Sequence, residues 1–253
     1  MKRGARVRMR GVRKAFGSTE VLCGVDLDAE PGTTTVVLGP SGSGKSVLLR
    51  LLVGLLPSDA GEIYFDDARI DTLSESQLDP FRTQMGFLFQ LSALFDSMTV
   101  AENLAFPLEE HTTMDRRQRL ERIEQTLAMV DMEGYESRYP AQLSGGQQRR
   151  IALARAIVLR PRLVLYDEPT TGLDPVRARD INLLINKLKQ ELGITGLVVT
   201  HDLHSVEMVA DQVLLLLDGK VRVKGTYDEV MSSTDPRVQG FLTGRGDEPG
   251  EAV

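Results

Sequence analysis

One short segment constrains the fold more than any other: residues 39–46, which read Gly-Pro-Ser-Gly-Ser-Gly-Lys-Ser. The segment matches the pattern GxxxxGK[ST], in which glycines let consecutive backbone N–H groups turn inward around phosphates. An apolar run, Thr35 to Leu38, precedes it, and the apolar residues from Val47 onward indicate a helix buried against a sheet. A strand, a phosphate-binding loop and a helix in this order predict an α/β fold.

The same segment also predicts which of its residues bind the phosphates and which bind Mg²⁺. Lys45 is expected to reach the β- and γ-phosphates of ATP, and the Ser46 hydroxyl to ligate Mg²⁺. A Gly/Ser-rich turn could match the pattern by chance, but the strand before it and the helix after it disfavour that alternative. The residues of the loop that we expect to bind ATP are Gly39, Pro40, Ser41, Gly42, Ser43, Gly44, Lys45 and Ser46.

Composition excludes other classes of protein. Of the 253 residues 42% are apolar and 26% charged, which is ordinary for a globular protein, and the net charge of −6 does not suggest a nucleic-acid-binding surface. Cys23 is the single cysteine, so no internal disulfide can form and a reducing compartment is expected. The basic start, residues 1–13, is followed by no apolar core of a signal peptide. No apolar run approaches the roughly 20 residues of a membrane span, so a membrane role requires docking onto another protein.

The chain is expected to form one domain over residues 1–245, and the polar segment 246–253 is expected to be a flexible tail. Between about 74 and 160 the sequence becomes helical and more polar, which predicts a helical insert within an α/β core. Asp79-Pro80 is expected to start one helix, and Thr99 with Glu102 forms a capping box for the next. Asp218-Gly219 between apolar runs predicts a hairpin turn.

A second apolar run, Leu163 to Tyr166, ends in two adjacent acids, Asp167 and Glu168. Neighbouring residues of a strand point to opposite faces, so the two carboxylates are expected to divide their tasks. Asp167 is expected to hold Mg²⁺ through water, and Glu168 to polarise the attacking water as general base. Many strands end in acids, and the pair is specific only because a phosphate-binding loop lies upstream.

The run Leu143-Ser-Gly-Gly-Gln147 lies at the start of an expected helix. Ser144 can cap that helix, and Gly145 and Gly146 permit close approach to a phosphate, with Gln147 completing the motif. A capped turn alone would explain Ser-Gly-Gly. It would not explain the position shortly before an acid-ended strand in a chain with a phosphate-binding loop.

Together these motifs resemble the ABC ATPase superfamily along nearly the whole chain. The resemblance implies a P-loop nucleotide-binding domain with an antiparallel β subdomain and a helical insert. It also implies ATP-binding roles for Phe16, stacked on adenine, and for Asp174, in a loop at the dimer interface. Gln90 resembles the glutamine that senses Mg²⁺, and His201 the switch histidine that contacts the γ-phosphate. A core aromatic and a strand-end glutamine are the ordinary alternatives for Phe16 and Gln90.

The resemblance implies that ATP is bound between two domains. The phosphate-binding loop of one domain faces the Ser144 motif of a second, so two copies of the chain would pair head to tail as a homodimer. Binding of the γ-phosphate would close the dimer and hydrolysis would reopen it.

The superfamily motifs do not identify the transported substrate, which must be inferred from segments that differ between members of the superfamily. Residues 89–111, which include Ala93-Leu-Phe95 and Phe106-Pro-Leu108, are similar to the ATPases of Mla/MCE-type systems, which move phospholipids between membranes. Ser92 departs from the family's glycine at that position. The resemblance implies an integral-membrane permease and an MCE-domain protein as partners, and a peripheral location on the cytoplasmic face of the inner membrane. Amino-acid importers, lipoprotein exporters and a soluble iron–sulfur assembly ATPase remain alternatives.

Overall fold

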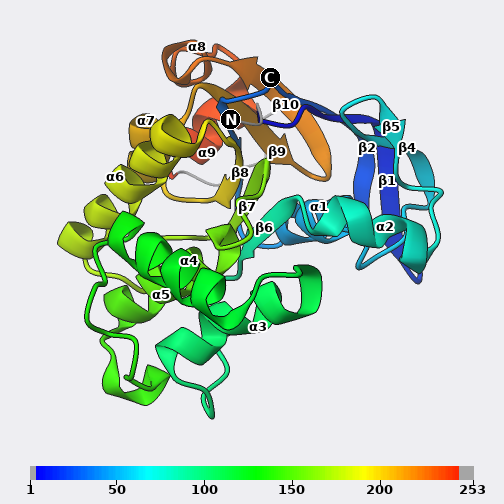
Figure 1. The fold of residues 1–253 in the computed structure, drawn as a ribbon. Coiled ribbons are helices and arrows are strands. Elements are labelled where there is room, and N and C mark those ends of the chain that lie inside the picture. Colours follow the sequence, from blue (N-terminus) through cyan, green and yellow to red (C-terminus); the bar gives the residue numbers. More distant parts are fainter. Residues whose placement is uncertain (1–3, 245–253) are drawn as a thin grey trace, which may run out of the picture.

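The computed structural model describes residues 4–244 of the 253-residue chain. The flexible tail expected at 246–253 therefore lies outside the described residues. Two β-sheets and the helices packed around them make up the described part of the chain, with the smaller sheet on one side and helices α3 to α6 on the other (Figure 1).

The smaller sheet is antiparallel and has the strand order β2-β1-β4-β5. Its strands are β1 (Val7–Phe16), β2 (Thr19–Ala29), β4 (Ala60–Phe65) and β5 (Ala68–Arg69). Buried and more exposed residues alternate along the start of β1, as expected for a sheet with one face on the core, and the alternation shifts at a bulge between Met9 and Val12. Phe16 ends this strand.

The larger sheet has the order β10-β9-β3-β8-β7-β6 and is parallel from β9 to β6. Its strands are β3 (Thr34–Leu38), β6 (Met85–Leu88), β7 (Leu163–Asp167), β8 (Thr195–Thr200), β9 (Gln212–Leu217) and β10 (Lys220–Gly225). The last two form the hairpin predicted at Asp218-Gly219, whose φ angles of 48° and 69° suit a type I′ turn. Since β3, β6, β7 and β8 are parallel, the segments that follow them meet at one edge of the sheet.

Both faces of this sheet are covered. Along β7, Leu163 and Leu165 pack into the cluster formed with β1, β2 and α1, while Val164 and Tyr166 pack into the cluster formed with helices α3 to α6. A strand buried on both faces needs apolar residues at every position, and this explains the continuous apolar runs in the sequence.

The helices begin where their caps are found. They are α1 (Lys45–Leu52), α2 (Glu75–Arg82), α3 (Val100–His111), α4 (Arg116–Met129), α5 (Gly145–Ile157), α6 (Pro175–Leu192), α7 (Leu203–Val209), α8 (Tyr227–Met231) and α9 (Pro236–Leu242), with a 3₁₀ turn η1 (Pro140–Gln142). The capping box of Thr99 with Glu102 and the Ser144 cap are confirmed.

The start expected at Asp79-Pro80 is wrong. Helix α2 begins one turn earlier, because Ser74 and Gln77 form a capping box in which the Ser74 N–H donates to Gln77 Oε1 at 3.0 Å. Asp79 and Pro80 therefore lie inside the helix.

Candidate active site

The phosphate-binding segment connects β3 to α1, as predicted. Gly42 and Gly44 have φ angles of 82° and 100°, a region in which a side chain would be strained, so the loop depends on glycine there. The Lys45 side chain lies along the loop, and its ammonium group donates to the carbonyl oxygens of Gly39 and Pro40 at 2.8 and 2.9 Å. The buried Ser43 hydroxyl has no hydrogen-bond partner in the described residues, which leaves it available to a phosphate oxygen.

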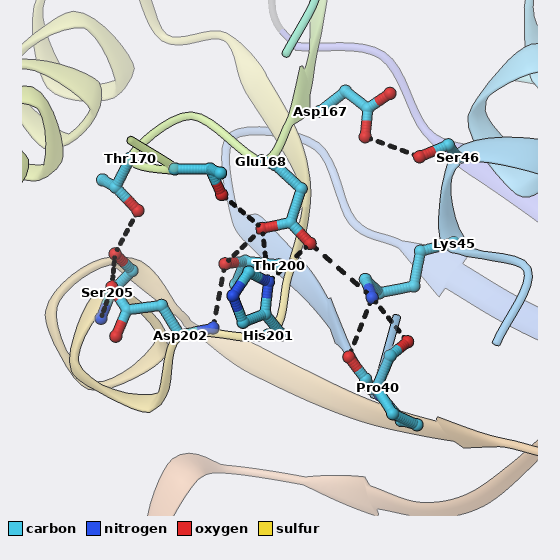
Figure 2. Close-up of polar contacts among 12 residues, drawn as sticks. Pro40, Lys45, Ser46, Asp167, Glu168, Thr170, Thr200, His201, Asp202 and Ser205 are labelled. Atoms are coloured by element: carbon cyan, nitrogen blue, oxygen red, sulfur yellow. Dashed lines mark hydrogen bonds and ion pairs between the residues drawn. The ribbon is translucent and has the colours of Figure 1, made fainter. Parts of the chain in front are cut away.

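Ser46 and Asp167 meet although 121 residues separate them. The Ser46 hydroxyl donates to Asp167 Oδ1 at 2.8 Å (Figure 2). Burial raises the pKa of Asp167 above its ordinary value, and the hydrogen bond from Ser46 opposes that rise. Two hard oxygen donors at one point at the end of β7 are the kind of ligands that Mg²⁺ takes.

Glu168 follows the last residue of β7 and does not continue the strand. Its φ angle is 49°, and its N–H donates to the carbonyl of Val199 in β8. We expected strand alternation to direct the two carboxylates to opposite faces, and this reason is wrong, since Glu168 is not in the strand. The two carboxylates are separated because the chain turns at Glu168, which directs its side chain to the end of β8.

The Glu168 carboxylate is surrounded by donors (Figure 2). The hydroxyls of Thr171 and Thr200 donate to Oε2 at 3.1 and 3.2 Å, and His201 Nδ1 lies 3.0 Å from both carboxylate oxygens. The Lys45 ammonium lies 3.6 Å from Oε1. A carboxylate held on all sides is fixed in direction, which is what a group that orients a water molecule requires.

Lys45 is 6% exposed, and burial lowers its pKa, while the charges of Glu168 and Asp167 act in the opposite direction. The three groups thus place one positive and two negative charges at the end of the parallel strands. A polyphosphate with its metal ion carries charges that complement both signs.

One pocket of about 270 Å³ joins the predicted residues from four different segments. Its lining consists of Val21, Ser41, Gly42, Gly44, Lys45, Ser46, Val47, Gln90, Glu168 and His201. Gln90 reaches it because it follows β6, the neighbour of β7 in the sheet.

A second set of predicted residues does not line this pocket in the described part of the chain: Phe16, Ser144, Gly145, Gly146, Gln147 and Asp174. Phe16 is 48% exposed, so it is not a core aromatic, and the Lys14 ammonium lies 5.6 Å from its ring centre. Ser144 caps α5, and Asp174 caps α6 by accepting from the Val176 and Arg177 N–H groups.

Three residues of the site were not predicted from the sequence. Thr171 and Thr200 hold Glu168, and Val21 lines the pocket from β2. Thr200 could have been found, since it ends the strand immediately before His201. Thr171 and Val21 carry no local signal, because their contacts depend on how distant segments pack.

Comparison with known proteins agrees with this geometry. Residues 22–171 match the family model described as ABC transporter. The intermembrane phospholipid transport system ATP-binding protein MlaF of Escherichia coli K12 is 40% identical over 243 residues, which is 96% of this chain and 90% of that protein.

Two further relatives have similar identities. The probable ribonucleotide transport ATP-binding protein Mkl of Mycobacterium leprae is 39% identical over 97% of this chain and 71% of its own length. The chloroplastic protein trigalactosyldiacylglycerol 3 of Arabidopsis thaliana is 39% identical over 96% of this chain and 75% of its own length.

Solved structures share the fold. A dimeric ATP-binding cassette in a post-hydrolysis state, bound to ADP and Pi, matches with a TM-score of 0.79 and 34% identity over 87% of this chain and 98% of that one. CbiO1 of Clostridium perfringens, part of the cbiONQ transporter complex, matches with a TM-score of 0.83 and 28% identity over 93% of this chain and 94% of that one.

Proposed function

This chain belongs to the ABC transporter family and is an ATPase subunit that binds and hydrolyses ATP, and from that premise we propose that it powers the movement of phospholipids between membranes. In this proposal, two copies pair head to tail and dock on a separate permease at the cytoplasmic face of the inner membrane. An MCE-domain protein carries the lipid. The nucleotide-binding domain spans 1–245, with the helices within 74–160 as its helical subdomain.

The observation that carries the lipid assignment is the 40% identity to MlaF along 96% of this chain. The similarity extends beyond residues 22–171, the segment that matches the family model. The plant relative, whose name is that of a galactolipid, supports a lipid as the cargo.

Docking on a membrane protein is supported by an apolar surface next to Gln90. Leu91 is 89% exposed, and Phe89, Phe95 and Phe106 are exposed at the rim of a cavity of about 450 Å³. Exposed apolar patches of this kind mark interaction sites in proteins. Within residues 4–244 no helix has the length and apolarity to span a bilayer.

The head-to-tail dimer is supported by the split between the two sets of site residues. The phosphate loop, Glu168 and His201 share one pocket, whereas Ser144 and Asp174 cap helices away from it. A second copy would bring its Ser144, Gly145, Gly146 and Gln147 to that pocket. The solved cassettes with this fold include dimers.

Within one copy we assign Glu168 as the base that polarises the attacking water, and His201 and Lys45 as the groups that contact the γ-phosphate. Phe16 stacks on adenine, for which its exposed ring at the end of β1 is suited. Ser46, Asp167 and Gln90 would hold Mg²⁺, which would neutralise part of the negative charge of the phosphates.

The mycobacterial relatives favour a second candidate, ribonucleotide transport, because their identity of 39% is nearly the same. One experiment separates the two. The tagged chain is purified from membranes with its partners and reconstituted in donor vesicles, and transfer of a fluorescent phospholipid to acceptor vesicles is followed with and without ATP. The matched control is the same complex with the Glu168→Gln chain.

We expect co-purification of a small permease and an MCE-domain protein, and phospholipid transfer that requires ATP and the wild-type chain. Recovery of a permease without an MCE-domain protein, together with ATP-driven uptake of ribonucleotides and no lipid transfer, would overturn the lipid assignment. Recovery of iron–sulfur assembly proteins alone would overturn the transport role altogether.

A further inference from the structure

Arg149 is a buried cation in an unusual setting. It lies in α5, five residues after the Ser144 cap, and is 5% exposed. Within residues 4–244 its guanidinium pairs with no carboxylate and instead donates to three backbone carbonyls. Burying an unpaired charge costs several kcal/mol unless hydrogen bonds satisfy its donors, so a charge in such a place needs a reason.

The three carbonyls belong to two different segments. Nη1 donates to Phe89 and Gln90 at 2.8 and 2.6 Å, and Nη2 donates to Thr171 at 3.3 Å. The first pair lies directly after β6, and Thr171 lies in the loop after Glu168. One planar side chain thus bridges the segment that carries Gln90 to the segment that carries Glu168.

Through Thr171, Arg149 is connected to the Glu168 carboxylate. The Thr171 hydroxyl donates to Glu168 Oε2, so the residue whose carbonyl Arg149 holds is itself bonded to the Glu168 carboxylate. On the other side, Arg149 holds the carbonyl of Gln90, which lines the same pocket. The position of α5 is therefore linked through a single guanidinium to both sides of the pocket.

A second arginine of the same helix has only half of this role. Arg155 donates to the carbonyls of Ser92 and Ala93, further along the segment after β6, and within residues 4–244 it makes no hydrogen bond to the loop after Glu168. Arg150, next to Arg149, donates to the carbonyl of Val130 and pairs with Asp131, just after α4. Of the three arginines of α5, Arg149 therefore contacts both segments, Arg155 contacts one of them and Arg150 contacts neither.

We propose that Arg149 is a positioning residue for ATP hydrolysis: it fixes the spacing between Gln90 and the Glu168 carboxylate, and it transmits the orientation of α5, the helix of the Ser144 motif, to both. The proposal rests on the roles assigned above to Gln90 and Glu168. It requires the fork of a guanidinium, since a lysine ammonium cannot donate in parallel to carbonyls of two segments from one planar group.

The test measures kcat and KM for ATP in Arg149→Lys, with Arg150→Lys as the matched control and thermal unfolding of each variant. Because a misplacement of about 1 Å costs on the order of a hundredfold in rate, we expect Arg149→Lys to lose about ten- to a hundredfold in kcat, with KM changed by less than about threefold. Arg150→Lys should retain both constants.

A purely structural role is separated by a double-mutant comparison. If Arg149 acts through Glu168, adding Arg149→Lys to Glu168→Gln should lower the residual hydrolysis far less than it lowers the wild-type rate. If Arg149→Lys proves too unstable to assay, Arg149→Gln serves in its place, because its amide is neutral and has one NH₂ group instead of the two of the guanidinium fork.

Two failures are distinguishable. Wild-type turnover by Glu168→Gln overturns the assigned base and leaves Arg149 without its target. Slow turnover by Glu168→Gln together with wild-type kcat in Arg149→Lys, or equal fractional losses in the two backgrounds, overturns the Arg149 proposal alone.

Discussion

At the scale of single residues, the Glu168 carboxylate is held in one orientation by the groups around it. Two threonine hydroxyls, a histidine and a lysine surround it, and it is 7% exposed. Its φ angle of 49° is uncommon for a residue other than glycine. Backbone strain at a site is tolerated only where the surrounding structure enforces it, and here the bond from the Glu168 N–H to Val199 does so.

We predict that Glu168→Gln binds ATP normally and hydrolyses it about a hundred- to ten-thousandfold more slowly, because the amide keeps the shape and accepts no proton. Phosphate release measures the rate, a fluorescent ATP analogue measures binding, and light scattering detects the ATP-bound dimer that should accumulate. Glu207→Gln, an exposed change in α7, is the control. Wild-type phosphate release by Glu168→Gln would remove Glu168 as the base.

At the scale of elements, the segment between β6 and α3 is held by side chains from elsewhere. Asn103 is fully buried; its amide donates to the carbonyls of Phe95, Met98 and Thr99, and its Oδ1 accepts from the Phe95 N–H. The backbone before it is strained, since Ser92 and Ala93 have φ angles of 60° and 50°. Glycine at position 92, as in the Mla/MCE pattern, would adopt this conformation without strain. The serine of this chain adopts it with a strained backbone.

Ser92→Gly is therefore expected to stabilise the protein. Relief of the left-handed conformation gains about 1–2 kcal/mol, and the greater freedom of glycine in the unfolded chain returns about 0.5–1 kcal/mol of it. A net gain of up to about 1.5 kcal/mol should raise the melting temperature by up to about 6 °C. Calorimetry measures this, and Ser97→Gly, at a residue without a positive φ, should give no gain. A lower melting temperature for Ser92→Gly would contradict the strain.

At the scale of the whole molecule, the pocket is built from five segments of one copy, and the Ser144 motif is not part of its lining. If two copies complete each other, defects in the two halves should complement. Lys45→Ala removes the phosphate-binding lysine, and Ser144→Arg blocks the capped end of α5, so each homodimer is inactive.

In a one-to-one mixture, half of the dimers carry both variants, and each of these has one site with both halves intact. We expect recovery of about a quarter of the wild-type sites, because every heterodimer keeps one of its two sites. Phosphate release after mixing and reassembly measures it. Lys45→Ala mixed with Glu168→Gln should recover nothing, since both defects lie in the same half. Absence of recovery in the first mixture would contradict the head-to-tail arrangement.

The sequence by itself determined the parts whose signals are local. A phosphate-binding loop is specified by eight consecutive residues, and a buried parallel strand by a short apolar run, so β3, β7, β8 and the helices capped by Thr99 and Ser144 could be predicted. The start of α2 was predicted wrongly because Ser74 and Asp79 both carry helix-start signals, and the capping box that Ser74 forms with Gln77 decides between them.

Only the tertiary structure decided which residues meet. Ser46 and Asp167 are 121 positions apart, and Arg149 reaches Gln90 across 59 positions and Thr171 across 22. Such contacts follow from the order of strands in the larger sheet and from the side of it that α5 covers. No run of neighbouring residues encodes that order, because strand order is a property of the whole packed core. The phosphate-binding loop and the two acids could be predicted from the sequence, and Arg149, which joins the segment of Gln90 to the loop after Glu168, could not.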